Sequence, residues 1–75
     1  MGWYVEVDYD VDMDGWNVEF DGEAEARDFF ERCVNARVTL QEESNVILVS
    51  SGNVVDAYRV CEREDGIWEA SCIIS

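Results

Sequence analysis

The sequence predicts a single small α+β domain of order β-β-α-β-β-β, in which one helix packs on a curved antiparallel sheet. Two patterns indicate this class: apolar residues alternate with acidic ones in the first third of the chain, and apolar residues recur at helical spacing directly afterwards. The remaining sequence consists of apolar or alternating runs separated by turn signals. Because the chain has 75 residues and no proline-rich or low-complexity linker, residues 1–75 are expected to form one compact acidic domain.

The first segment is expected to be a β-hairpin. Every odd position from Trp3 to Met13 is apolar, and the even positions from Glu6 to Asp14 are acidic, which is typical of a strand with one buried face. Asp14-Gly15 is a favoured two-residue hairpin turn, and residues 16–20 resume the alternation. This turn pairs apolar residues on one face: Met13 with Trp16, Val11 with Val18, and Tyr9 with Phe20. It pairs polar residues on the other: Asp12 with Asn17, Asp10 with Glu19, and Asp8 with Asp21.

A helix is expected after the hairpin. Asp21 is a suitable N-cap, Glu23 and Glu25 suit the positive end of the helix dipole, and Asn35 is a plausible last residue. Five apolar residues fall on one helical stripe that should face the hairpin: Ala26, Phe29, Phe30, Cys33 and Val34. Two pairs at i,i+4 spacing should support the exposed side: Arg27 with Glu31, and Asp28 with Arg32.

The second half predicts strands at residues 46–50, 54–62 and 67–74, with turn signals at 51–53 and at Asp65-Gly66. Residues 46–49 are apolar without alternation, which indicates a central strand or one covered on both faces. Residues 37–41 predict an additional short strand in which Val38 and Leu40 point inward. A two-residue loop at Asp65-Gly66 would set Arg63 against Trp68, a mixed pair that leaves the last register open.

The composition excludes several classes of function. Eighteen acids stand against five arginines, with no lysine or histidine, and the formal charge of −13 would repel nucleic acid and anionic membranes. The chain has no apolar run long enough for a membrane span and no signal-peptide pattern at Met1, so a cytoplasmic protein is expected. Without histidine or a cofactor motif, we expect neither enzymatic activity nor a cofactor. Three cysteines without C-x-x-C spacing are expected to be buried free thiols: Cys33, Cys61 and Cys72.

The strongest functional signal is the row of acids in the first half. Residues 1–31 hold eleven of the 18 acids and a single arginine, and no basic residue of the hairpin opposes the row. Like charges facing each other destabilise a sheet, so the row is either a solvated strand whose charges protect a sheet edge or a functional surface. Alternate strand residues lie about 6.6 Å apart, comparable with successive phosphates, so such a row would fit an arginine-lined nucleic-acid groove. The candidate partner-binding residues are Tyr4, Glu6, Asp8, Asp10, Asp12, Asp14, Glu19, Asp21, Glu23 and Glu25.

Calcium binding is the alternative interpretation of the same residues. Asp10, Asp12 and Asp14 precede Gly15, and Asp21 occupies the twelfth position, which matches the ligand spacing of an EF-hand loop. An EF-hand loop requires a helix on both sides, whereas the preceding segment alternates like a strand. A small calcium-binding or structural interaction domain that uses these aspartates therefore stays as the second hypothesis.

Four features of the chain are shared with a known class of proteins: the acid row from Glu6 to Asp14, its continuation through residues 19–25, the small size and the lack of a catalytic set. With these features the chain resembles the small acidic proteins with which phages block host defence, especially anti-CRISPR proteins of the DNA-mimic type. The resemblance is one of type and covers the first half of the chain. It implies a stoichiometric inhibitor that blocks the DNA-binding, PAM-reading surface of a CRISPR effector complex or a similar host-defence nuclease. The implied partner is a basic nucleic-acid-binding protein, such as an effector subunit, bound by a monomer or weak dimer in the cytoplasm of an infected cell.

Overall fold

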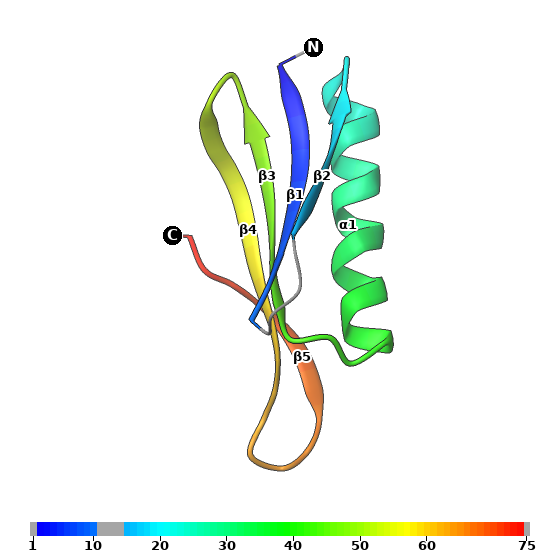
Figure 1. Ribbon diagram of the computed structural model, residues 1–75, viewed down its shortest axis with the longest axis vertical. Helices are drawn as coiled ribbons and strands as arrows, with labels where there is room; N and C mark the ends of the chain where they lie inside the picture. Colours follow the sequence, from blue (N-terminus) through cyan, green and yellow to red (C-terminus); the bar gives the residue numbers. More distant parts are fainter. Residues whose placement is uncertain (1, 11–14, 75) are drawn as a thin grey trace.

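In a computed structural model, which describes residues 2–10 and 15–74, one helix lies on one face of a five-stranded antiparallel sheet (Figure 1). The elements are β1 (Trp3–Tyr9), β2 (Trp16–Phe20), α1 (Glu23–Thr39), β3 (Ser44–Ser50), β4 (Asn53–Glu62) and β5 (Trp68–Cys72). The strands are ordered β2-β1-β3-β4-β5 across the sheet. The expected α+β class and the order β-β-α-β-β-β are therefore confirmed. Among the described residues, no helix is both long and apolar enough to cross a membrane.

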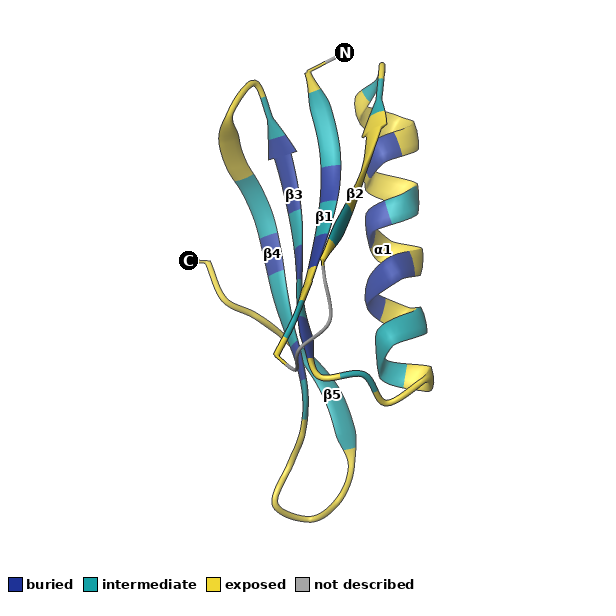
Figure 2. Cartoon of the chain, in the orientation of Figure 1, coloured by how far each residue is buried: buried dark blue, intermediate teal, exposed yellow. Residues whose placement is uncertain are grey.

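The core lies between α1 and the sheet (Figure 2). Four residues of the expected helical stripe are buried there: Ala26, Phe30, Cys33 and Val34. Phe29 is only half-buried, because it lies at the flank of the helix against Trp16 and Phe20. From the sheet, Val5, Val7, Val46 and Leu48 complete this core. The face of the sheet opposite α1, here called the open face, carries the remaining side chains of the alternating strands.

The register of the first hairpin differs from the expected one. Trp16 pairs with Val7, which lies six residues before the predicted partner Met13. The shift is an even number of residues, so the same apolar side chains still face the core. On its other edge β1 pairs with β3 from Trp3 to Tyr9, and the Asp10 N–H donates to the Glu43 carbonyl at 3.4 Å. The predicted partners Val11 to Asp14 lie outside the described residues.

The helix is longer than predicted and absorbs the start of the predicted strand at 37–41. Its N-cap is Gly22 rather than Asp21, and it ends at Thr39 rather than at Asn35. In this position the Arg37 side chain lies 2.8 Å from Glu42 and 5.8 Å from the ring of Trp16. These tertiary contacts of a mostly buried arginine explain why the helix continues where local alternation indicated a strand.

The second half follows the prediction more closely. β3 is a central strand between β1 and β4, and Val46, Leu48 and Val49 are buried, as the unbroken apolar run indicated. The loop between β4 and β5 is longer than the expected two residues, because Glu62 pairs with Trp68. The Arg63 N–H donates to the Ile67 carbonyl at 2.8 Å, so Arg63 does not face Trp68 and the mixed pair is avoided.

Candidate acidic binding face

The open face of β1 and β2 gathers part of the predicted acidic row. Tyr4, Glu6 and Asp8 project from β1, and they alternate with Val5 and Val7, which point into the core. On β2, Glu19 lies opposite Tyr4 and Asn17 lies opposite Glu6. We call these five open-face residues the acidic face: Tyr4, Glu6, Asp8, Asn17 and Glu19. The like-charge pairs expected from the hairpin, Asp10 with Glu19 and Asp8 with Asp21, do not form in this register.

Glu6 and Asp8 are neighbouring acids, and among the described strand partners neither lies opposite a charged residue. On β3 they face Ile47 and Asn45, and on β2 Glu6 faces Asn17. The pKa of Glu6 is raised, chiefly through a side-chain hydrogen bond with Asp8, and burial and repulsion by the Asp8 charge add to the effect. The raised pKa means that the fold favours the protonated form of Glu6 beside Asp8, chiefly through this hydrogen bond, with charge repulsion as a smaller contribution.

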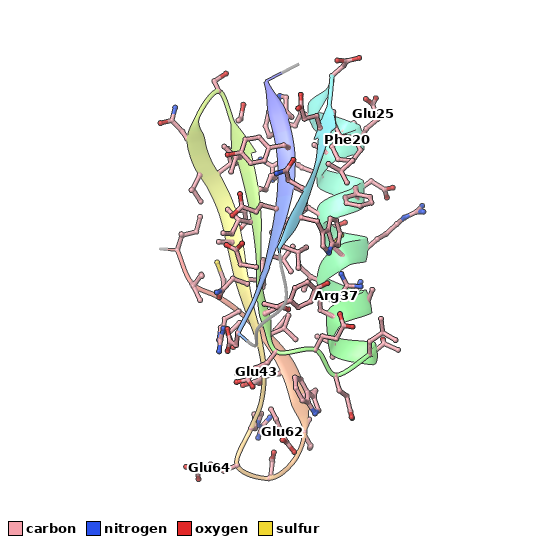
Figure 3. All side chains as sticks on the ribbon, in the orientation of Figure 1. Phe20, Glu25, Arg37, Glu43, Glu62 and Glu64 are labelled. Carbon is pink, nitrogen blue, oxygen red and sulfur yellow. The ribbon has the colours of Figure 1, made fainter. Side chains whose placement is uncertain are left out.

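The carboxylate of Asp10 forms an ion pair with an arginine of β4. Nη1 of Arg59 donates to Oδ1 of Asp10 at 2.7 Å, and Nη2 donates to Oδ2 of the same carboxylate. Arg59 also lies 3.5 Å from the Oδ1 atom of Asn45 and from the Oε2 atom of Glu43, whose side chain projects near the base of β1 in Figure 3. The hydrogen bond from Arg59 lowers the pKa of Asp10. An arginine from β4, outside the hairpin, therefore neutralises this acid of the row.

All five arginines of the chain are paired with carboxylates. Besides Arg59, the closest pairs are Arg27–Glu23 at 2.7 Å, Arg32–Asp28 at 3.1 Å, Arg37–Glu42 at 2.8 Å and Arg63–Asp65 at 2.9 Å. The predicted pair of Asp28 with Arg32 is confirmed, whereas Arg27 contacts Glu23 instead of Glu31. Since the chain has no lysine, every cationic side chain is neutralised internally. The net charge of −13 is therefore carried by the remaining carboxylates.

The other predicted acids lie elsewhere. Asp21, Glu23 and Glu25 follow β2, in the turn before α1 and in its first turn, and Figure 3 shows Glu25 at this end of the molecule. Glu62 and Glu64 lie at the opposite end, in the hairpin between β4 and β5. Sequence reasoning missed this second acidic end, which the acid-rich run at residues 62–65 signals. Asp12 and Asp14 lie outside the described residues. The predicted ladder is thus a set of separate acidic groups on a body 40 Å long.

The position of β1 in the sheet bears on why its acids are there. β1 lies between β2 and β3, so it is not an edge strand. Charges on the open face of an interior strand do not protect an edge against pairing. Protection of a sheet edge therefore does not explain Glu6, which pairs with both neighbouring strands, whereas Asp8 lies beyond the last β1–β2 pair. Tyr4 is half-buried beside them, between Glu19 and Val49, which gives it the position of an interface anchor.

Comparisons with known proteins add no family to this description. No family model, curated protein or solved structure matches the chain. The functional argument therefore rests on the residues of the acidic face and on the charge of the whole chain.

The structure separates two of the residues of the calcium pattern. Phe20, next to Asp21, pairs with Trp3 at one end of β1, and Asp10 follows the other end. The seven residue steps from Trp3 to Asp10 place the two aspartates about 23 Å apart, so they do not bind one ion. Asp10 is also held by Arg59. Among the described residues, no group of three or more His, Cys, Asp or Glu side chains is placed to hold a metal.

The cysteines differ in exposure. Cys33 is buried in the core as expected, and burial raises the pKa of its thiol. Cys61 is half-buried, and Cys72 is exposed at the end of β5, so the expectation of a buried thiol is wrong for Cys72. All three are free thiols.

Proposed function

We propose that this protein is a stoichiometric inhibitor that occupies the nucleic-acid-binding surface of a basic partner protein. The observation that carries the proposal is the distribution of charge: all five arginines are paired internally, while Glu6 and Asp8 repel each other on an open face that they share with Glu19. Such a surface attracts an arginine- or lysine-lined groove from a distance. It also displaces the counterions that nucleic acid would otherwise displace.

The charge density supports competition with nucleic acid. Duplex DNA carries one charge for each 1.7 Å or so of its axis, or about 24 charges over 40 Å. This protein has a long axis of 40 Å and a net charge of −13, about half that density. Charge alone would therefore hold a basic groove less tightly than DNA does. Additional contacts are needed, and Tyr4 on the acidic face is the residue best placed to supply one.

The resemblance to DNA-mimic anti-CRISPR proteins gives the partner its class, a CRISPR effector or a similar host-defence nuclease. Effectors of this kind read the PAM with arginines that make paired hydrogen bonds to bases. The carboxylates of Glu6, Asp8 and Glu19 can accept the same paired hydrogen bonds from a guanidinium group. Inhibition by occupancy requires no bond-making step, so the proposal assigns no catalytic residue and no cofactor.

A competition experiment tests this function. The tagged protein is used to capture partners from host lysate at low salt, and each captured nucleic-acid-binding protein is then purified with fluorescently labelled DNA bound. Titration with the inhibitor should release the DNA at about one inhibitor per site, and direct binding of the inhibitor to the DNA-free partner should weaken as salt rises. A stable ternary complex that retains DNA, or binding that is insensitive to salt, would contradict the proposal.

A further inference from the structure

β5 is the edge of the sheet farthest from β2, and its backbone has hydrogen-bonding groups to offer. The residues directly before and after β5, Ile67 and Ile73, form their backbone hydrogen bonds on the β4 side. The Arg63 N–H donates to the Ile67 carbonyl, and the Ile73 N–H donates to the Ala57 carbonyl. Backbone direction alternates along a strand, so the even positions direct their N–H and C=O groups away from β4. These positions are Trp68, Ala70 and Cys72. A strand edge of this kind is a template for a further strand.

The side chains around β5 are apolar and nearly uncharged, in contrast to the rest of the molecule. Ile67, Ile73 and Ile74 flank the strand and are 57%, 53% and 38% exposed. The exposed segment that leads to the C-terminus is visible in Figure 2. Residues 66–74 hold one charged side chain, Glu69, and Arg63 lies 3.7 Å from it. A second strongly acidic chain can therefore approach this edge with little local repulsion, whereas the β2 edge carries acids.

We propose that β5 pairs antiparallel with β5 of a second copy of this chain, about a two-fold axis at Ala70. In this register the outward-directed even positions bond to one another, as an antiparallel ladder requires. Ile67 then lies opposite Ile73 of the second copy, and Glu69 lies opposite Ser71. An axis at Glu69 would set that acid against itself, and an axis at Ser71 would set Glu69 against Ile73. The sequence of β5 is thus self-complementary in one register.

The helix side of this edge offers room for the second copy. A groove of about 450 Å³ lies between α1 and the β4–β5 half of the sheet, and Phe30, Val34, Tyr58 and Ala70 are among its lining residues. Tyr58 pairs with Cys72, which in the two-fold register lies opposite Trp68 of the second copy. That indole would lie beside the Tyr58 end of the groove. Since the axis is perpendicular to the sheet, the open faces of both copies, with their acidic faces, lie on the same side.

Sedimentation analysis over a range of concentrations tests the proposal. The wild-type chain should shift from its monomer mass of 8.6 kDa toward twice that mass as concentration rises. Ile73→Glu should raise the dimer dissociation constant about tenfold or more, because it places an acid against Ile67 of the second copy. Leu40→Glu is the matched control, since Leu40 is 60% exposed at the C-cap of α1 and is not part of the strand that pairs. It adds the same charge and should leave the constant within about threefold of wild type.

Two further readouts make the outcome decisive. Ala70→Pro removes the outward N–H at the axis and should abolish the dimer in a chain that circular dichroism shows to be folded. Raising salt should strengthen the dimer by screening two copies of charge −13, the opposite of its effect on binding to a basic partner, so the two proposals fail separately. A chain that stays monomeric to about 1 mM, equal effects of the two Glu variants, or a dimer that survives Ala70→Pro would overturn it. The proposal would also be overturned if the β5 amides were protected from hydrogen exchange only when a different protein is bound, and not in the wild-type chain by itself.

Discussion

Replacing Asp8 by Asn should stabilise the fold, because it removes one of two like charges on the acidic face. Glu6 and Asp8 are alternate residues of β1, so their side chains leave the strand about 6.6 Å apart. The side-chain hydrogen bond brings the two carboxyl groups closer than this, and two unit charges about 4 Å apart repel by about 1 kcal/mol in a water-like dielectric. Screening at physiological ionic strength reduces this to about 0.6 kcal/mol. For a domain of this size, the gain corresponds to a rise in melting temperature of about 2–5 °C.

The assay is thermal unfolding at neutral pH, at low and at high salt. The matched control is Asp28→Asn, which removes the same charge from a carboxylate that lies 3.1 Å from Arg32. The free energy of unfolding of that variant should fall by a few tenths of a kcal/mol. The gain from Asp8→Asn should shrink at high salt. The reasoning is refuted if Asp8→Asn lowers the melting temperature, or if both variants raise it equally, since the effect would then come from net charge rather than from the acidic face.

Three further predictions concern the scaffold. Gly15→Ala should lower the free energy of unfolding by about 1–3 kcal/mol in urea denaturation, because a Cβ at Gly15 would lie 2.5 Å from a carbonyl oxygen of β1; an unchanged value would contradict this close approach. Phe30→Ala should cost about 3–5 kcal/mol and Phe29→Ala clearly less, since only Phe30 is fully buried; equal losses would place both rings in the core. Arg59 lowers the pKa of Asp10, so the stability that this pair contributes is present at neutral pH and is lost as pH falls through the lowered value, below the ordinary 3.8. Arg59→Gln should abolish this acid-dependent loss in urea titrations, and an unchanged pH profile would show that the pair contributes none of it.

The sequence predicts faces better than it predicts partners along a strand. Alternation from Trp3 onward correctly indicated that Val5 and Val7 would be buried, and the helical spacing placed Phe30 in the core. Register was not predictable, because moving Trp16 from Met13 to Val7 keeps the same residues on the same face. Local alternation therefore does not distinguish the two registers.

The candidate site was predictable in part for the same reason. Glu6 and Asp8 share the open face because they share a strand, which local alternation determines. The bond between Asp10 and Arg59 joins residues 49 positions apart, and no local pattern signals it. That long-range contact neutralises one acid of the row and leaves the charge of the face on Glu6, Asp8 and Glu19.

The most direct test of the central claim compares two triple variants for binding to the captured nucleic-acid-binding partner. Glu6→Gln/Asp8→Asn/Glu19→Gln neutralises the acidic face. The control, Asp28→Asn/Glu42→Gln/Asp65→Asn, neutralises three acids that are paired with arginines. Each triple variant changes the net charge by the same three units, from −13 to −10.

The measured quantity is the affinity of each triple variant in competition with labelled DNA at two salt concentrations. The account predicts that the face variant loses about tenfold or more in affinity and shows a weaker salt dependence, while the control stays within about threefold of wild type. Equal losses for both triple variants, or full displacement of DNA by the face variant, would contradict the claim that this face mimics nucleic acid.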